Sequence, residues 1–206
     1  MALIKHNNQS LSNVTALPAS VPTGKMTLLS TATASASASL SFNSTYINSD
    51  YLVYKFEFIN IHSSAIAKFT FNLSVDLGSN YNVTKTTTLF TAYHYENDGG
   101  TELTYDNDNS DLAQSTAFQS LIYYNQNTDN DSATSGTLTL FNPSSTTYVK
   151  HFIATSNSMH TGGANRFQAN SYVAGYGNTT SAVNAIRFQM SSGNIDDGII
   201  KLYGVK

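Results

Sequence analysis

Strict alternation of apolar and polar residues is the feature that most constrains what this chain can fold into. Along residues 68–77 (KFTFNLSVDL), Phe, Leu and Val alternate with Lys, Thr, Asn, Ser and Asp without a break. Successive side chains of a β-strand point to opposite faces, so this pattern predicts a strand with one dry and one solvated face. Residues 51–61 follow the same rule, with Phe56 and Phe58 on one parity and Glu57 on the other.

The same pattern recurs along most of the chain. β-branched and aromatic residues predict further strands, each bounded by clusters of Gly, Asn, Asp, Pro and Ser: 86–96, 117–125, 136–141, 147–156, 166–176, 182–192 and 198–205. Only residues 111–118 have the composition for a single helical turn. Short strands at regular spacing without intervening helices predict an all-β fold, an antiparallel β-sandwich of jelly-roll-like architecture. At 206 residues in total, we expect a single sandwich domain over residues 26–206.

The segment Thr31–Phe42 (TATASASASLSF) places alanines on one parity and hydroxyl residues on the other. A helix would spread the alanines around all sides, so the segment is predicted as a strand. Its alanine face is small, and two partners fit it. One is the aromatic core of its own domain, and the other is a second subunit. The candidate subunit contacts are Ala34, Ala36 and Ala38.

Residues 1–25 differ from the rest of the chain. Apolar residues are sparse there, without a sustained period, and Pro18, Pro22 and Gly24 interrupt the segment. We interpret it as an extended N-terminal arm, for which a frayed terminus is the alternative. The apolar residues that would dock such an arm are Leu3, Ile4, Leu11, Val14 and Leu17.

Charge is scarce in this protein. Charged residues make up 11% of the chain, against about 25% in an ordinary domain, and the formal net charge is −3. No basic stripe suggests a nucleic-acid partner, and no run of 18 apolar residues suggests membrane insertion. The N-terminus lacks the apolar stretch of a secretory signal, so we expect folding in a cytoplasm. The surface must then be built from Ser, Thr, Asn and Gln.

Reactive chemistry is not indicated by any motif. None of the five histidines has a partner at metal-ligand spacing, and no Gly-x-Ser-x-Gly elbow occurs. Asp106, Asp108 and Ser110 resemble the opening of a calcium loop, but Asp111 and Ala117 stand where Gly and Glu are required. We therefore predict a protein that is not an enzyme, with no catalytic residue, metal site or cofactor.

Tyrosines near loops rich in Asn and Asp are the candidate ligand surface. Aromatic rings beside hydrogen-bonding side chains suit sugars or another protein. The alternative is that these rings are divided between the core and the outside. The residues concerned are Tyr123, Tyr124, Tyr172 and Tyr176.

Several longer segments resemble small β-rich virion proteins of tailed bacteriophages of marine bacteria, cyanophages among them. The segments that carry this resemblance are residues 2–14, 91–99, 111–121, 140–156 and 174–206. It implies a structural protein located on the virion and assembled in the bacterial host cytoplasm, with other virion proteins as partners. It supplies no catalytic residues.

The expected function is a non-enzymatic virion structural protein. Residues 1–25 would anchor it, and the sandwich would be exposed on the particle as a head-decoration or capsid-fibre module. Virions repeat their parts, so a homo-oligomer is expected, with a trimer favoured. The alternative is a tail-fibre or receptor-binding protein that recognises host surface glycans. A rival from another class is a carbohydrate-binding or lytic module that acts on the host envelope.

Overall fold

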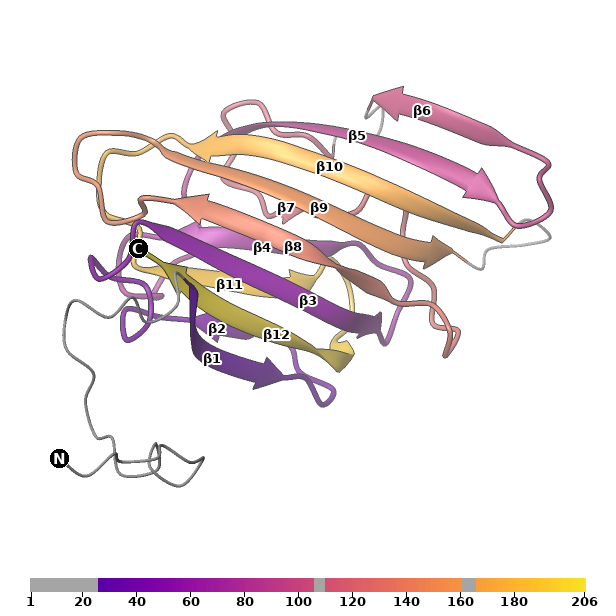
Figure 1. Cartoon of the computed structure of the whole chain (residues 1–206), viewed down its shortest axis with the longest axis horizontal. Coiled ribbons are helices and arrows are strands. Elements are labelled where there is room, and N and C mark those ends of the chain that lie inside the picture. The colour runs from indigo at the N-terminus through magenta and orange to yellow at the C-terminus, as the bar shows by residue number, and fades with distance from the viewer. Residues whose placement is uncertain (1–25, 106–109, 161–165) are drawn as a thin grey trace, which may run out of the picture.

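The computed structural model describes residues 26–105, 110–160 and 166–206, and these form two antiparallel β-sheets packed face to face (Figure 1). The predicted all-β sandwich is confirmed. The predicted arm with its docking residues Leu3, Ile4, Leu11, Val14 and Leu17 lies outside the described residues, as do Asp106 and Asp108 of the calcium-like motif.

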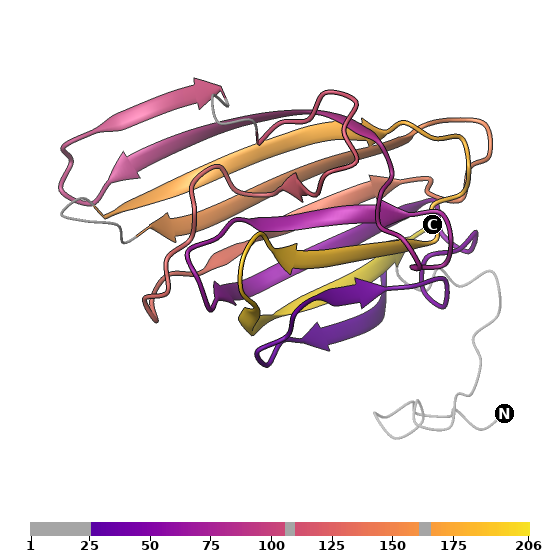
Figure 2. The same ribbon diagram turned by 180° about the vertical axis from the view of Figure 1, so that it is seen from behind.

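The larger sheet has eight strands. In spatial order they are β1 (Met26–Thr33), β12 (Ile195–Val205), β3 (Val53–Ser63), β8 (Thr134–Phe141), β9 (Lys150–His160), β10 (Phe167–Gly177), β5 (Lys85–Tyr95) and β6 (Thr101–Tyr105). The smaller sheet has four strands, in the order β2 (Leu40–Phe42), β11 (Ala185–Met190), β4 (Phe69–Ser74) and β7 (Gln119–Ser120). Figure 2 shows the smaller sheet in front of the larger one, which leaves the opposite side of the larger sheet uncovered in Figure 1.

Phenylalanine rings from both sheets form the centre of the core. Phe188 of β11 lies with its ring centroid 5.3 Å from those of Phe56 and Phe58 on β3 and 5.9 Å from that of Phe69 on β4. All four side chains are almost fully buried. Tilted and edge-to-face ring pairs add to the free energy gained by burying their area. The alternation read from residues 51–61 and 68–77 therefore directs these rings inward. The solvated face predicted for residues 68–77 is wrong over β4, because its polar residues Thr70, Asn72 and Ser74 are buried as well.

An irregular segment, residues 110–133, covers the inner side of β10 and β5. Leu112 and Leu121 are buried there, and the amide of Tyr123 donates to Ser171 Oγ of β10 at 3.1 Å. The strand predicted over 117–125 is wrong except for the two residues of β7, and residues 111–118 contain no helical turn.

The alanine segment is not one strand. β1 ends at Thr33 and β2 begins at Leu40, because the chain passes here from the larger to the smaller sheet. Ala36 adopts a left-handed φ of 48°, which breaks the alternation. As a result Ala34 is buried in the core, whereas Ala36 and Ala38 are exposed, so the three residues do not form a common contact face.

Candidate functional site

The uncovered side of the larger sheet over β8, β9, β10, β5 and β6, which we call the outer face, is the candidate site. Within these five described strands, the charged residues are Lys85, Glu102 and Lys150. All three alternate toward the inner side, so the outward positions of these strands carry no Lys, Arg, Asp or Glu. They do include two histidines, His151 and His94, and His94 Nε2 lies 3.0 Å from Asp98 Oδ1. The outward side of β3 is different, since it carries the ion pair of Lys55 and Glu57, with Nζ and Oε1 3.2 Å apart.

Two aromatic rings form a ridge in the middle of the outer face. Phe90 of β5 and Tyr172 of β10 are register partners in the sheet. Their rings stack with centroids 5.0 Å apart and an interplanar angle of 12°, and each side chain is 39% exposed. The side-chain amide of Asn170 donates to Tyr172 Oη at 2.9 Å, which fixes the tyrosine ring. The ridge consists of two pre-ordered rings that retain accessible surface.

A groove of about 490 Å³ lies beside the ridge. Ala174 and Gly175 of β10 form its floor, where the sheet presents little side chain. A Cβ atom on Gly175 would lie 2.6 Å from the carbonyl oxygen of Thr86, so a close approach of β5 to β10 requires glycine there. The groove is chiefly apolar, and its walls include Phe141, His151, Ile153 and Tyr176.

Large apolar side chains continue on both sides of the ridge and groove. Leu103 of β6 is 71% exposed and Ile153 of β9 is 54% exposed. Single exposed apolar residues are normal on protein surfaces, but a contiguous apolar patch marks an interaction site. Aromatic residues are also enriched, and charged residues depleted, at the centres of protein interfaces. The outer face presents exposed aromatic and apolar side chains and no outward Lys, Arg, Asp or Glu, with Thr, Asn and Gln side chains between them.

The four tyrosines that the sequence indicates as a ligand surface do not come together. Tyr172 and Tyr176 lie on the outer face, and Tyr176 lines the groove. Tyr123 and Tyr124 belong to the segment that covers the inner side of β10, where burial raises the pKa of Tyr124. The sequence analysis did not identify Phe90 as a surface residue. Its neighbour Leu89 is buried, and successive residues of a strand face opposite sides, so Phe90 faces outward.

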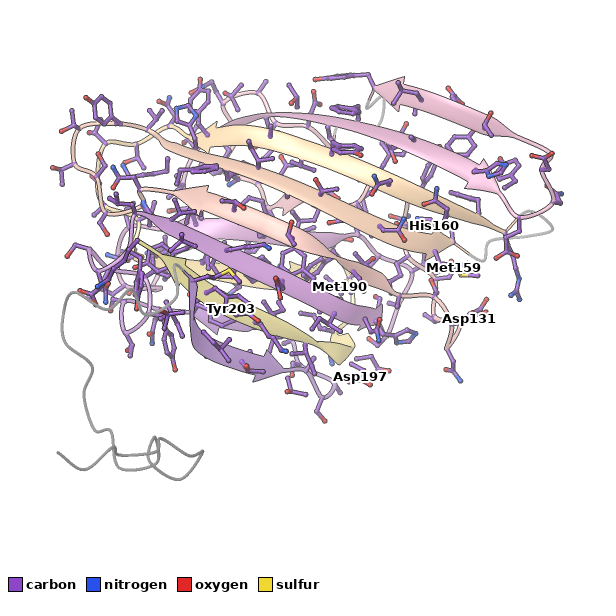
Figure 3. The ribbon with its side chains drawn as sticks, in the orientation of Figure 1. Asp131, Met159, His160, Met190, Asp197 and Tyr203 are labelled. Carbon is purple, nitrogen blue, oxygen red and sulfur yellow. The ribbon has the colours of Figure 1, made fainter. Side chains whose placement is uncertain are left out.

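A second cavity, of about 510 Å³, is polar and lies where β3 ends and β12 begins. Its walls include His62, Asn130, Asp131, Asp196 and Asp197, and Figure 3 labels Asp131 and Asp197 near this end of the sheet. The Nδ1 atom of His62 lies 3.5 Å from a carboxylate oxygen of Asp196. Over residues 26–105, 110–160 and 166–206, no group of three or more His, Cys, Asp or Glu side chains is arranged to hold a metal ion.

A serine and a histidine meet inside the sandwich. His160 Nε2 accepts from Ser158 Oγ at 2.9 Å, and His160 Nδ1 donates to the carbonyl of Asn125 at 2.9 Å. Burial lowers the pKa of His160 to about 4, so the ring is neutral at pH 7. Both side chains are buried, and the bond from His160 to Asn125 attaches the covering segment to β9.

Lys85 is a buried amine between the two sheets. Its Nζ donates to Asn72 Oδ1 at 2.5 Å and to the carbonyl of Val83 at 2.8 Å, and the side chain is fully buried. Burial penalises the charged form and lowers the pKa of Lys85 to about 7. This residue links β4 of the smaller sheet to β5 of the larger one.

No protein-family model, curated protein or solved structure matches this chain. In the part of the chain that the structure describes, no helix has the length and apolarity needed to cross a membrane.

Proposed function

We propose that this chain is a non-enzymatic structural protein of a bacteriophage virion. Residues 26–206 are the sandwich exposed on the particle as a head-decoration or capsid-fibre module, and residues 1–25 anchor it. Other virion proteins and further copies of the chain are its partners. The resemblance of residues 91–99, 140–156 and 174–206 to small virion proteins supports this proposal.

The observation that carries the proposal is the outer face. It carries exposed aromatic rings and no outward Lys, Arg, Asp or Glu, and the elements that the structure describes cover only the opposite side of its sheet. Surfaces of this kind are costly to leave in water and are found where another protein docks. A repeating assembly such as a virion supplies such a neighbour at every copy.

The first test is the content of purified particles. Virions of the phage that encodes this chain are washed at high salt, and their proteins are counted by quantitative mass spectrometry. We expect the chain at a fixed copy number that resists washing. Its absence from particles, or its complete loss in the wash, would contradict the proposal.

The anchoring role of residues 1–25 has its own test. A chain lacking residues 2–24 retains every strand of the sandwich, because β1 begins at Met26. We expect this variant to melt cooperatively at the same temperature as the full chain and yet to be missing from particles when it replaces the full chain. Normal incorporation of the shortened chain would show that the anchor lies elsewhere.

The polar cavity favours a second candidate function, a tail-fibre or receptor-binding protein that recognises host glycans. Carboxylate, amide and imidazole groups surround its 510 Å³ and match the hydroxyl groups of sugars. A glycan array probed with the full chain and with Asn130→Ala tests it. Binding that Asn130→Ala removes would favour this function, and a polysaccharide-cleavage assay separates binding from a lytic activity.

A further inference from the structure

The contact between Lys85 and Asn72 places an amine against a side-chain amide inside the sandwich. Lys85 is the first residue of β5 and Asn72 lies within β4, and neither is exposed to solvent. Lys85 Nζ lies 2.5 Å from Asn72 Oδ1, and a C=O bond is about 1.2 Å long, so Nζ lies within about 3.7 Å of the carbonyl carbon Cγ. Reacting atoms in a near-attack arrangement are about 3–3.5 Å apart. The amine therefore lies close to the range from which it attacks an amide.

Hydrogen bonds to the backbone fix the Asn72 amide in front of the amine. Asn72 Nδ2 donates to the carbonyl oxygens of Tyr81 and Thr116, at 2.7 and 2.9 Å. Asn72 Oδ1 accepts from the backbone N–H of Leu73 at 2.8 Å. A donor at that oxygen stabilises the negative charge that develops there when a nucleophile adds to Cγ. The amide is thus both oriented and polarised.

The Lys85 amine is available as a nucleophile near neutral pH. Its Nζ also donates to the carbonyl of Val83, and burial lowers its pKa to about 7. On β4 and on the covering segment the groups at this site are amides and carbonyls. Across the larger sheet the inward row runs from Lys85 through Gly177 to Lys150, whose charge is also positive. None of these groups favours the protonated form of Lys85, so the neutral amine is present at pH 7 and above.

We propose that Lys85 and Asn72 form an intramolecular isopeptide bond, which joins the two sheets covalently. Nζ adds to Cγ, the bond from Cγ to Nδ2 breaks, and Nδ2 leaves as ammonia with the proton that Nζ gives up. The product is a neutral secondary amide in place of a buried amine, whose charged form is costly to bury. Within the described residues no carboxylate contacts the pair to assist the proton transfer, so the bond forms slowly. The inference concerns contacts within one chain and does not depend on the proposed function.

Mass spectrometry of the intact chain tests for the bond. The purified chain is held at pH 5, where only about 1% of the Lys85 amine is neutral, and a part of it is moved to pH 8.5. We expect the chain at pH 8.5 to lose the mass of one ammonia molecule at least about tenfold faster than the chain at pH 5. The Lys85 amine titrates only in chains in which the bond has not formed, so material kept at pH 5 retains it.

Proteolysis of the same samples locates the bond. A protease that cleaves before aspartate cuts at Asp76 and separates residues 50–75 from residues 76–97 in a chain without the bond. We expect the incubated chain to yield a branched product, in which the two fragments are joined through Asn72 and Lys85. Succinimide formation at an asparagine also releases ammonia, but it does not join two fragments.

Lys85→Met removes the nucleophile and should give no joined fragments, whereas Lys55→Met, which changes a partly exposed lysine, should give them as the wild type does. Wild-type fragments that stay separate after incubation at pH 8.5 would overturn the inference, and that result does not depend on whether Lys85→Met folds. Joining at equal rates at the two pH values, or in guanidinium chloride, would also overturn it. So would joining through Lys150, whose Nζ donates to the backbone carbonyls of Tyr148 and Thr179.

Discussion

At the residue scale, Lys85 is the group whose chemistry the fold alters most clearly. An amine that is fully buried and held only by Asn72 and Val83 oxygens has no carboxylate to balance its charge within the described residues. Its pKa of about 7 means that the folded protein releases a proton that the unfolded chain retains up to about pH 10.5. Folding therefore becomes more favourable as the pH rises through this window.

Replacing Lys85 by Met should remove that pH dependence. Below pH 7 both folded and unfolded wild-type chains carry the proton, and between pH 7 and about 10.5 only the unfolded chain does. We expect the unfolding free energy of the wild type to rise relative to Lys85→Met by about 1 kcal/mol per pH unit in this window. Denaturant unfolding at pH 7, 8.5 and 10 measures this difference.

Lys55→Met is the matched control for this experiment. Lys55 is partly exposed and paired with Glu57, so this variant also exchanges a lysine for methionine on the larger sheet but keeps the buried amine of Lys85. Parallel stability profiles for the wild type and Lys85→Met would show that the buried amine keeps its ordinary pKa.

At the element scale, β11 contributes a ring, Phe188, that contacts rings of both sheets. Phe188 contacts rings from β2, β3 and β4, so its removal leaves a cavity at the centre of the sandwich. Strands of the smaller sheet are short, and three of them meet at this ring. The stability of the whole domain should depend on it.

Phe188→Ala is expected to lower the free energy of unfolding by about 3–5 kcal/mol. Tyr148→Ala, which removes an aromatic ring that is 69% exposed, should change it by less than about 1 kcal/mol. Chemical denaturation at a single pH compares the two variants. Similar losses for both would mean that Phe188 is not the centre of the core.

The sequence predicts most of the strands because alternation is a local signal. β4 and β3 were predicted from their own residues, since one parity of each is consistently apolar. β6 (Thr101–Tyr105) was missed because its short run TELTY has too few alternations to stand out from the turns around it. The strand predicted over residues 117–125 was wrong because its apolar residues do not alternate. Leu121 and Ile122 are adjacent and both buried, which an irregular segment allows.

The candidate site was only partly predictable for a related reason. In β5, Leu89 and Phe90 are neighbours of similar hydrophobicity, so the sequence does not indicate which of them faces inward. Leu89 is the buried one because the smaller sheet and residues 110–133 cover the side of the larger sheet that Leu89 faces. Tyr172 was expected at a surface, but its stacking on Phe90 depends on the pairing of strands that are far apart in the chain.

At the scale of the whole molecule, the sandwich is asymmetric. Its inner layer is a core of phenylalanines, the outward side of β3 carries the ion pair of Lys55 and Glu57, and the outward positions of β8, β9, β10, β5 and β6 carry no Lys, Arg, Asp or Glu. Such a molecule has one side suited to solvent and one side suited to another protein. That division is the structural basis for proposing a component of a larger particle.

Hydroxyl-radical footprinting of intact virions tests this central claim most directly. The reagent labels accessible aromatic side chains, and Tyr172 is 39% exposed in the single chain. The account predicts that Tyr172 in virions is labelled several-fold less than Tyr172 in the purified chain free in solution. Equal labelling of Tyr172 in the two samples would contradict it.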